Sequence, residues 1–182
     1  MIPKIIHYCW FGGNPLPMDV KKCIESWKEK CPDYEIKCWD ESNFDVNAHP
    51  FTKAAYEAKA WAFVSDYARL RVVYDNGGIY LDTDVELLKN LVFSFVHTKA
   101  ILVYNKLDVT VQPVWDFGAI KESRIIKQML DKYNNINFKA DERAKIACPY
   151  LNNAVMEEIG YCYNEIDSVE INGFLILPPK IS

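Results

Sequence analysis

Two aspartates, Asp82 and Asp84, stand one residue apart behind a short apolar run, in the stretch GGIYLDTDVE of residues 77–86. Side chains alternate between the two faces of an extended segment, so a strand over residues 79–87 would turn one set of side chains toward the core. The opposite set is Tyr80, Asp82, Asp84 and Glu86. Carboxylates this close repel one another, and a bound divalent cation removes the conflict. Oxygen ligands of this kind suit Mg²⁺, Mn²⁺ or Ca²⁺ better than zinc.

The position of the two aspartates along the predicted strand favours a ligand site. In open α/β sheets, ligands collect at the carboxyl ends of strands, which is where Asp82 and Asp84 fall. Two protein carboxylates leave metal positions that a diphosphate could fill, so the ion would act as a Lewis acid on a leaving group. A D-x-D triplet is common by chance, however, and a solvated acidic loop is the alternative interpretation.

The segment AWAFVSDYARLRVVY before the aspartates predicts a helix. Its apolar residues recur at intervals of four, three and four: Phe63, Tyr67, Leu70 and Tyr74. Asp66 and Arg69 are i, i+3 neighbours on a different face. They form either an ordinary surface ion pair or a site that reads sugar hydroxyls, because a carboxylate accepts hydrogen bonds and a guanidinium donates them.

Three aromatic or imidazole side chains are further candidates. Trp10 lies where the first predicted strand runs into Gly12 and Gly13, and its ring either packs in the core or stacks on a nucleobase. His7 is expected to be satisfied within a strand, and His49 precedes a proline in a loop. Neither histidine is favoured as a catalytic base.

The order of predicted elements indicates one α/β domain spanning residues 1–182, without repeat or linker. The expected strands cover residues 4–11, 34–39, 79–87, 100–104 and 173–179. A first amphipathic helix is expected on Val20, Cys23, Ile24 and Trp27 and ends near the CPD of residues 31–33, and further helices are expected over residues 53–74, 123–135 and 150–160. A polar loop is expected over residues 40–50. The first strand, helix and second strand predict a parallel pair with a crossover.

Composition limits the classes of function. The net charge is −4, so no basic surface indicates nucleic-acid binding. The six cysteines show no zinc-ligand spacing, and they are expected to be reduced and structural. No apolar run approaches the roughly 18–20 residues that span a bilayer. These features predict a cytoplasmic protein and are compatible with peripheral contact at the inner face of a membrane.

The motifs together resemble a known enzyme family. IPKIIHYCWFGG, CIESWKEKCPDYEIKCWDESNFD, WAFVSDYARLRVVYDNGGIYLDTDVELL and FGAIKES are similar to sequences of glycosyltransferase family 32, which includes α-1,6-mannosyltransferase and bacterial capsule and lipopolysaccharide enzymes. The centre, S-D-x-x-R-x-x-x-x-x-x-x-G-G-x-Y-x-D-x-D, is far more specific than D-x-D alone. The resemblance implies a GT-A type fold with a Rossmann-like mixed sheet flanked by helices. It also implies a UDP- or GDP-sugar donor, a Mn²⁺ or Mg²⁺ ion and retention of anomeric configuration.

The resemblance also implies roles for residues of the donor site. The same pattern is similar to that of the large clostridial glucosylating toxins. By that analogy Trp10 stacks on the base, Asp66 and Arg69 bind the donor sugar and ribose, and Tyr80 lines the donor pocket. Ser65, which precedes Asp66 in the motif, is placed among the donor-binding residues.

The metal and the catalytic residues are implied in the same way. Asp82 would contact ribose, sugar and, through water, the metal, whereas Asp84 would ligate the metal directly. Asp82, Asp84 and Arg69 are therefore the expected catalytic residues. No residue is identified as a nucleophile.

The expected activity is transfer of a hexosyl group to a saccharide or lipid-linked acceptor in surface polysaccharide synthesis. Family members usually continue beyond the PP near the end into a segment with His and Trp, and this chain is expected to lack that tail. A non-catalytic or truncated nucleotide-sugar-binding protein is therefore the main alternative. A haloacid-dehalogenase-like phosphatase is disfavoured, because its D-x-D normally follows the first strand of the chain.

Overall fold

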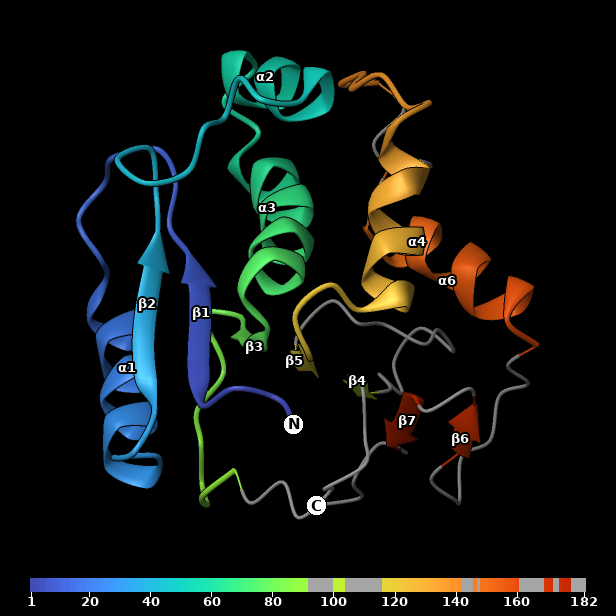
Figure 1. Ribbon diagram of the computed structural model, residues 1–182. Coiled ribbons are helices and arrows are strands. Elements are labelled where there is room, and N and C mark those ends of the chain that lie inside the picture. The colour runs from blue at the N-terminus through green and yellow to red at the C-terminus, as the bar shows by residue number, and fades with distance from the viewer. Residues whose placement is uncertain are drawn as a thin grey trace.

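The computed structural model describes residues 1–91, 100–103, 116–141, 146, 148–160, 169–171 and 174–177 (Figure 1). Its helices are α1 (Met18–Lys30), α2 (Pro50–Glu57), α3 (Trp61–Asn76), α4 (Arg124–Tyr133) and α6 (Cys148–Glu158). Its strands are β1 (Ile5–Cys9), β2 (Glu35–Trp39), β3 (Gly78–Leu81), β4 (Ala100–Val103), β5 (Asp116–Ala119), β6 (Val169–Ile171) and β7 (Phe174–Leu177).

The strands form a single mixed sheet in the order β2-β1-β3-β5-β4-β7-β6. β1 runs parallel to both β2 and β3, and β4 runs parallel to β7, whereas β5 is antiparallel to both of its neighbours. The predicted β1–α1–β2 crossover unit is confirmed, and so is the predicted mixed sheet flanked by helices. β5 and β6 are short strands that the sequence did not predict.

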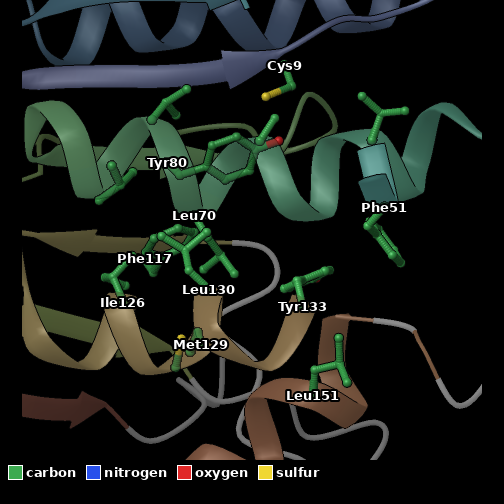
Figure 2. Close-up of a cluster of buried hydrophobic side chains, with 14 of the residues drawn as sticks. Cys9, Phe51, Leu70, Tyr80, Phe117, Ile126, Met129, Leu130, Tyr133 and Leu151 are labelled. Atoms are coloured by element: carbon green, nitrogen blue, oxygen red, sulfur yellow. The ribbon is translucent and has the colours of Figure 1, made fainter. Parts of the chain in front are cut away.

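Two hydrophobic cores lie on opposite faces of this sheet. On β3, Ile79 and Leu81 pack into the core that contains Ile24 and Trp27 of α1, whereas Tyr80 packs into the core formed with α3, α4 and α6. Figure 1 shows α1 beside β1 and β2, and α3 on the other side of β1. In Figure 2 the ring of Tyr80 lies between β1 and the helices of the larger core. The alternation of side chains along β3 thus joins three layers.

The long helix expected over residues 53–74 is wrong, because the chain breaks it into α2 and α3. Lys59 has a positive φ of 54°, which interrupts helical geometry without a glycine or proline. The Ala60 N–H bonds to the carbonyl of Ala55 at 2.9 Å, and the rings of Tyr56 and Trp61 meet edge to face with centroids 5.0 Å apart. These aromatic contacts across the break stabilise a corner that periodicity alone does not reveal.

The strand expected over residues 79–87 is also shorter than predicted. β3 ends at Leu81, and the Val85 N–H bonds back to the Asp82 carbonyl at 3.1 Å, which closes a turn over residues 82–85. Asp84 and Glu86 therefore do not share a strand face with Tyr80. The repulsion of three carboxylates in a row is relieved because the chain turns after the first of them.

The histidine predictions are confirmed. His7 is fully buried between the Gly77 carbonyl, 2.8 Å from its Nε2, and the Trp39 indole, whose Nε1 lies 3.1 Å from its Nδ1. His49 caps α2, since its Nδ1 accepts from the Phe51 N–H at 3.2 Å. Cys9 is buried, whereas Cys23 is only partly buried. Among the described cysteines none forms a disulfide, and Cys162 lies outside the described residues.

The remaining predicted elements agree with the described chain in type and place. The helices over residues 123–135 and 150–160 correspond to α4 and α6, and the last strand corresponds to β7. Residues 104, 173 and 178–179 of the predicted strands lie outside the described residues. Within the described ranges, no helix is long and apolar enough to cross a membrane.

The turn between α3 and β3 generates a test of the fold. A Cβ on Gly78 would lie 2.7 Å from the Ile5 carbonyl oxygen and 2.8 Å from the His7 ring, and its φ is +107°. Gly78→Ala is therefore expected to lower the free energy of unfolding by roughly 2–5 kcal/mol in urea denaturation.

Gly13→Ala is the matched control for this substitution. Gly13 also has a positive φ, of 68°, but a Cβ there would meet no atom within 4 Å. It should cost only the backbone strain of about 1 kcal/mol. Equal losses in the two variants would show that close packing at Gly78 is not what the turn requires.

Candidate functional site

The sequence-predicted residues gather at one edge of the sheet. β1 and β3 are parallel, with His7 opposite Tyr80, so both strands end at the same edge. Trp10 follows the end of β1, and Asp82 follows the end of β3. α3 runs back along these strands and carries Ser65, Asp66 and Arg69 toward the same edge.

Arg69 is the centre of this group. Its side chain is buried, with the residue only 5% exposed, yet it carries a guanidinium between two carboxylates. Its Nη2 lies 3.2 Å from Asp66 Oδ1, and its Nη1 lies 3.2 Å from Asp82 Oδ2. Its Nε donates to the backbone carbonyl of Ser65 at 3.2 Å. The helix therefore presents one charged group that joins α3 to the end of β3.

Tyr80 supports this group from within the core. Its ring lies 4.8 Å from the Arg69 guanidinium and stacks on Phe117 of β5, with ring centroids 5.8 Å apart. Its hydroxyl donates to Asp82 Oδ1 at 3.0 Å. Tyr80 is 1% exposed, so its buried hydroxyl orients the Asp82 carboxylate from within the core. The expectation that it lines the donor pocket stays a prediction.

Burial governs the electrostatics of these groups. Burial raises the pKa of Asp66 and of Asp82, and the positive charge of Arg69 opposes that rise in both. Burial alone would disfavour the charged guanidinium, but Tyr80, Asp82 and Asp66 together hold the pKa of Arg69 above its usual value. The guanidinium therefore stays charged, and its presence favours the ionised form of both carboxyls.

Asp84 differs from Asp82 because it is exposed. It lies in the turn after β3, two residues beyond the carboxylate that Arg69 and Tyr80 hold. The described residues contain no group of three or more His, Cys, Asp or Glu side chains arranged to hold a metal ion. An exposed carboxylate beside an oriented one nevertheless offers the oxygen donors that Mg²⁺ and Mn²⁺ prefer, and diphosphate oxygens could complete such a set. The residues present therefore fit a divalent ion that arrives with its phosphate ligand.

Trp10 is half-buried, and its orientation is fixed by the loop that follows it. Its indole Nε1 donates to the carbonyl of Asn14 at 2.7 Å, and its backbone N–H donates to the Trp39 carbonyl at 2.9 Å. Gly12 has a positive φ of 97°, and a Cβ there would lie 2.8 Å from the Trp61 ring. Glycine is therefore required at position 12 because the Trp61 ring leaves no room for a Cβ. This requirement does not depend on a ligand.

Two contacts of this edge were not predicted from sequence. The Gly12 N–H donates to Glu41 Oε1 at 2.7 Å, which ties the loop after β1 to the loop after β2. Asp66 accepts a hydrogen bond from the backbone N–H of Cys148, the first residue of α6. Both contacts join segments remote in sequence, and no local pattern announces them.

Comparison with known proteins decides the family. Residues 17–109, just over half of the 182-residue chain, match the family described as glycosyltransferase sugar-binding region containing DXD motif. The chain belongs to this family of glycosyltransferases. The match contains α3, β3 and both aspartates of the motif, so it covers the group around Arg69.

Curated relatives agree with this assignment. Over 97 residues the chain is 34% identical to an uncharacterized glycosyltransferase of Acanthamoeba polyphaga mimivirus. This match covers 50% of this chain and 39% of the relative. Over 88 residues it is 36% identical to inositol phosphoceramide mannosyltransferase 3 of Schizosaccharomyces pombe, which covers 46% of this chain and 24% of the relative. The matched part is thus less than half the length of either relative.

Solved structures show the fold. The PaToxG glycosyltransferase superposes with a TM-score of 0.67 and 20% identity, covering 86% of this chain and 68% of that one. A glycosyltransferase involved in the glycosylation of the major capsid of PBCV-1 gives a TM-score of 0.52 at 13% identity, covering 97% and 83%. The predicted GT-A type fold is thereby confirmed.

The buried pairs of Arg69 generate a pH-dependent prediction. Arg69→Met removes the charge that opposes the raised pKa of Asp66 and of Asp82, so both pKa values should rise further. A carboxyl whose pKa is higher in the folded than in the unfolded state stabilises the folded protein at low pH. This contribution is lost as the pH rises through the folded-state pKa. In metal-free buffer the free energy of unfolding of the variant should be about 3–5 kcal/mol lower than that of the wild type at about pH 7, and the difference should be smaller at about pH 5.

Arg71→Met is the control on the same helix. Arg71 pairs with Asp75 at 2.8 Å, and both side chains are well exposed. Its loss should cost about 0.5 kcal/mol, with little dependence on pH. Urea midpoints measured for both variants across this pH range provide the comparison, and a pH-independent loss for Arg69→Met would contradict the electrostatic account.

Proposed function

We propose that this protein is a metal-dependent, retaining glycosyltransferase that moves a hexosyl group from a nucleotide-diphosphate sugar to a saccharide or lipid-linked acceptor. The observation that carries the proposal is the buried Arg69, held between Asp66 and Asp82 directly before the exposed Asp84. The family assignment also argues against the phosphatase alternative.

The residues divide the recognition of the donor between them. The half-buried Trp10 offers an oriented indole for stacking on the base. Asp66 offers carboxylate oxygens to sugar hydroxyls, and Arg69 offers N–H donors, with Ser65 next to them on α3. Because Asp66 and Asp82 are already ordered by Arg69, little side-chain entropy is lost when the donor binds.

The aspartates of the motif would hold the divalent ion. Asp84, which is exposed, would ligate it directly, and Asp82 would contact it through water while its two oxygens remain bonded to Arg69 and Tyr80. A bound Mn²⁺ or Mg²⁺ supplies positive charge that neutralises the departing diphosphate. The charge of Arg69 acts in the same direction on the donor as the bond to the anomeric carbon breaks.

Retention requires either a double displacement or attack from the face that the leaving group vacates. Both carboxylates proposed to contact the sugar, Asp66 and Asp82, are ion-paired with Arg69, which lowers their nucleophilicity. The site therefore favours same-face attack by the acceptor hydroxyl, and Asp82, Asp84 and Arg69 stay its proposed catalytic residues.

The acceptor and the setting rest on the relatives. The fission-yeast relative is named for transfer of mannose to inositol phosphoceramide, a lipid, which supports a lipid-linked acceptor and makes GDP-mannose the first donor to test. A lipid-linked acceptor is compatible with the proposed role in surface polysaccharide synthesis, in the cytoplasm at the inner face of a membrane. UDP-sugars are the second class to test.

Asp84→Asn tests the proposed metal site. In the wild type, Mn²⁺ together with GDP-mannose or a UDP-sugar should raise the melting temperature, because a ligand that binds only the folded state stabilises it. Asp84→Asn should abolish the part of this shift that depends on Mn²⁺, without lowering the melting temperature of the free protein.

Glu86→Gln is the matched control, since Glu86 is another exposed carboxylate two residues further on. It should leave the Mn²⁺-dependent shift intact. An undiminished shift in Asp84→Asn would contradict the role of that residue. Binding without any transfer or hydrolysis of the sugar in the wild type would instead favour a non-catalytic binding protein.

Trp10→Ala tests the proposed base stacking. Loss of the indole should weaken binding of UDP or GDP by about 1–3 kcal/mol, the range found for bases stacked on aromatic side chains. Isothermal titration in the presence of Mn²⁺ measures this effect. A lower melting temperature with unchanged nucleotide affinity would show that the ring serves packing alone.

A further inference from the structure

A layer of buried polar side chains lies behind Asp66, where α3, α4 and α6 meet. Cys148 and Asn152 of α6 and Tyr133 of α4 are all 0% exposed. Asn152 Nδ2 donates to Cys148 Sγ at 2.9 Å. The Tyr133 ring meets Tyr67, the neighbour of Asp66 on α3, with centroids 5.3 Å apart. In Figure 2, Tyr133 projects from α4 near Leu151 of α6, inside the larger core.

This layer is an unfavourable place for polar atoms. Asn152 Oδ1 is buried and has no hydrogen-bond partner among the described residues, and the buried Tyr133 hydroxyl has there only the Cys148 thiol, a weak hydrogen-bonding group. Such an atom is unfavourable relative to an apolar group that fits the same space. Burial also raises the pKa of the Cys148 thiol to about 12, so the sulfur stays neutral and only accepts or weakly donates. Stability alone therefore does not account for the composition of the layer.

A hydrogen bond links the layer to Asp66. The backbone N–H of Cys148 donates to the Asp66 carboxylate. Cys148 is the first residue of α6, and N–H groups in the first turn of a helix have no partner inside the helix. The helix dipole adds a favourable interaction with the carboxylate. Asp66 is thus held from two sides, by Arg69 on its own helix and by the start of α6.

We propose that Cys148 and Asn152 are positioning residues for the donor sugar, because they fix the start of α6 and thereby the carboxylate of Asp66. Asn152 lies one turn after Cys148 and anchors its side chain, so the N–H stays aimed at Asp66. The inference rests on the proposed function, in which Asp66 contacts the sugar and not the nucleotide. It predicts that the layer controls affinity for the sugar part of the donor selectively.

The first experiment tests the contact without any ligand. Asn152→Leu, which preserves side-chain volume, is combined with Asp66→Ala in a double-mutant cycle, and urea midpoints are measured for all four proteins. Because Asn152 acts through Asp66, the double variant should be clearly more stable than the sum of the two single losses predicts. Additive losses would overturn the inference, whether or not the protein binds a nucleotide sugar.

The second experiment tests the consequence for the donor. With Mn²⁺ present, dissociation constants are measured for GDP-mannose and UDP-glucose and, in parallel, for GDP and UDP. Asn152→Leu should raise about ten-fold the dissociation constant of the sugar nucleotide that the wild type binds better, which is the scale of one hydrogen bond to a charged group. It should change the dissociation constant of the corresponding nucleoside diphosphate by less than about two-fold.

Two further variants separate positioning from general damage. Cys148→Ser keeps an acceptor for Asn152 and should retain the preference for the sugar nucleotide, whereas Cys148→Ala should lose it as Asn152→Leu does. Thr52→Val removes another buried hydroxyl, one that bonds the carbonyls of Val46 and His49, and should lower stability without changing the preference.

The outcomes distinguish the inference from the function on which it rests. Equal weakening of sugar nucleotide and nucleoside diphosphate in Asn152→Leu would overturn the positioning role while the proposed function stands. If the wild type binds none of the four nucleotides, the proposed function fails and the donor part of the inference fails with it, while the double-mutant cycle still reports on the contact.

Discussion

A buried guanidinium flanked by two carboxylates constrains this end of the molecule. Arg69 can remain inside the protein only while Asp66 and Asp82 compensate its charge, since removing one partner of a buried ion pair costs about 3–5 kcal/mol. The two partners belong to different elements, so the pairs fix how α3 lies against the end of β3. The Tyr80 hydroxyl, which bonds Asp82, and the start of α6, which bonds Asp66, complete the surroundings of these ion pairs. The folding of this region and the geometry of the site are therefore the same problem.

The sequence predicted those parts of the structure that local pattern determines. The apolar β1, the amphipathic α1 and the strand β2 follow from periodicity and from glycines that end elements, and their parallel pairing follows from the crossover rule. The family resemblance of the motif that contains Asp66, Arg69 and the D-x-D pair also singled out residues that the fold gathers at one edge. The i, i+3 relation of Asp66 and Arg69 is a local property, and it persists in the folded chain.

What the sequence missed depends on contacts between distant segments. The corner at Lys59 carries no glycine or proline, and it is stabilised by the rings of Tyr56 and Trp61. Alternation placed Tyr80 with the carboxylates on the face opposite the predicted core, but the larger core covers that face of β3. The hydrogen bond from Cys148 to Asp66 joins residues 82 positions apart and has no local signature. Burial in this protein is decided by which helices pack on each face of the sheet, and periodicity does not report that.

In the proposed function, a divalent ion binds between the Asp82–Asp84 turn and the diphosphate of an activated sugar. Anomalous diffraction from crystals soaked with Mn²⁺ and GDP or UDP measures the position of the ion directly. We expect a manganese peak next to the Asp84 carboxylate and the diphosphate oxygens, with Asp82 still paired to Arg69. A peak elsewhere, with both aspartates directed into bulk solvent while the nucleotide is bound, would contradict it.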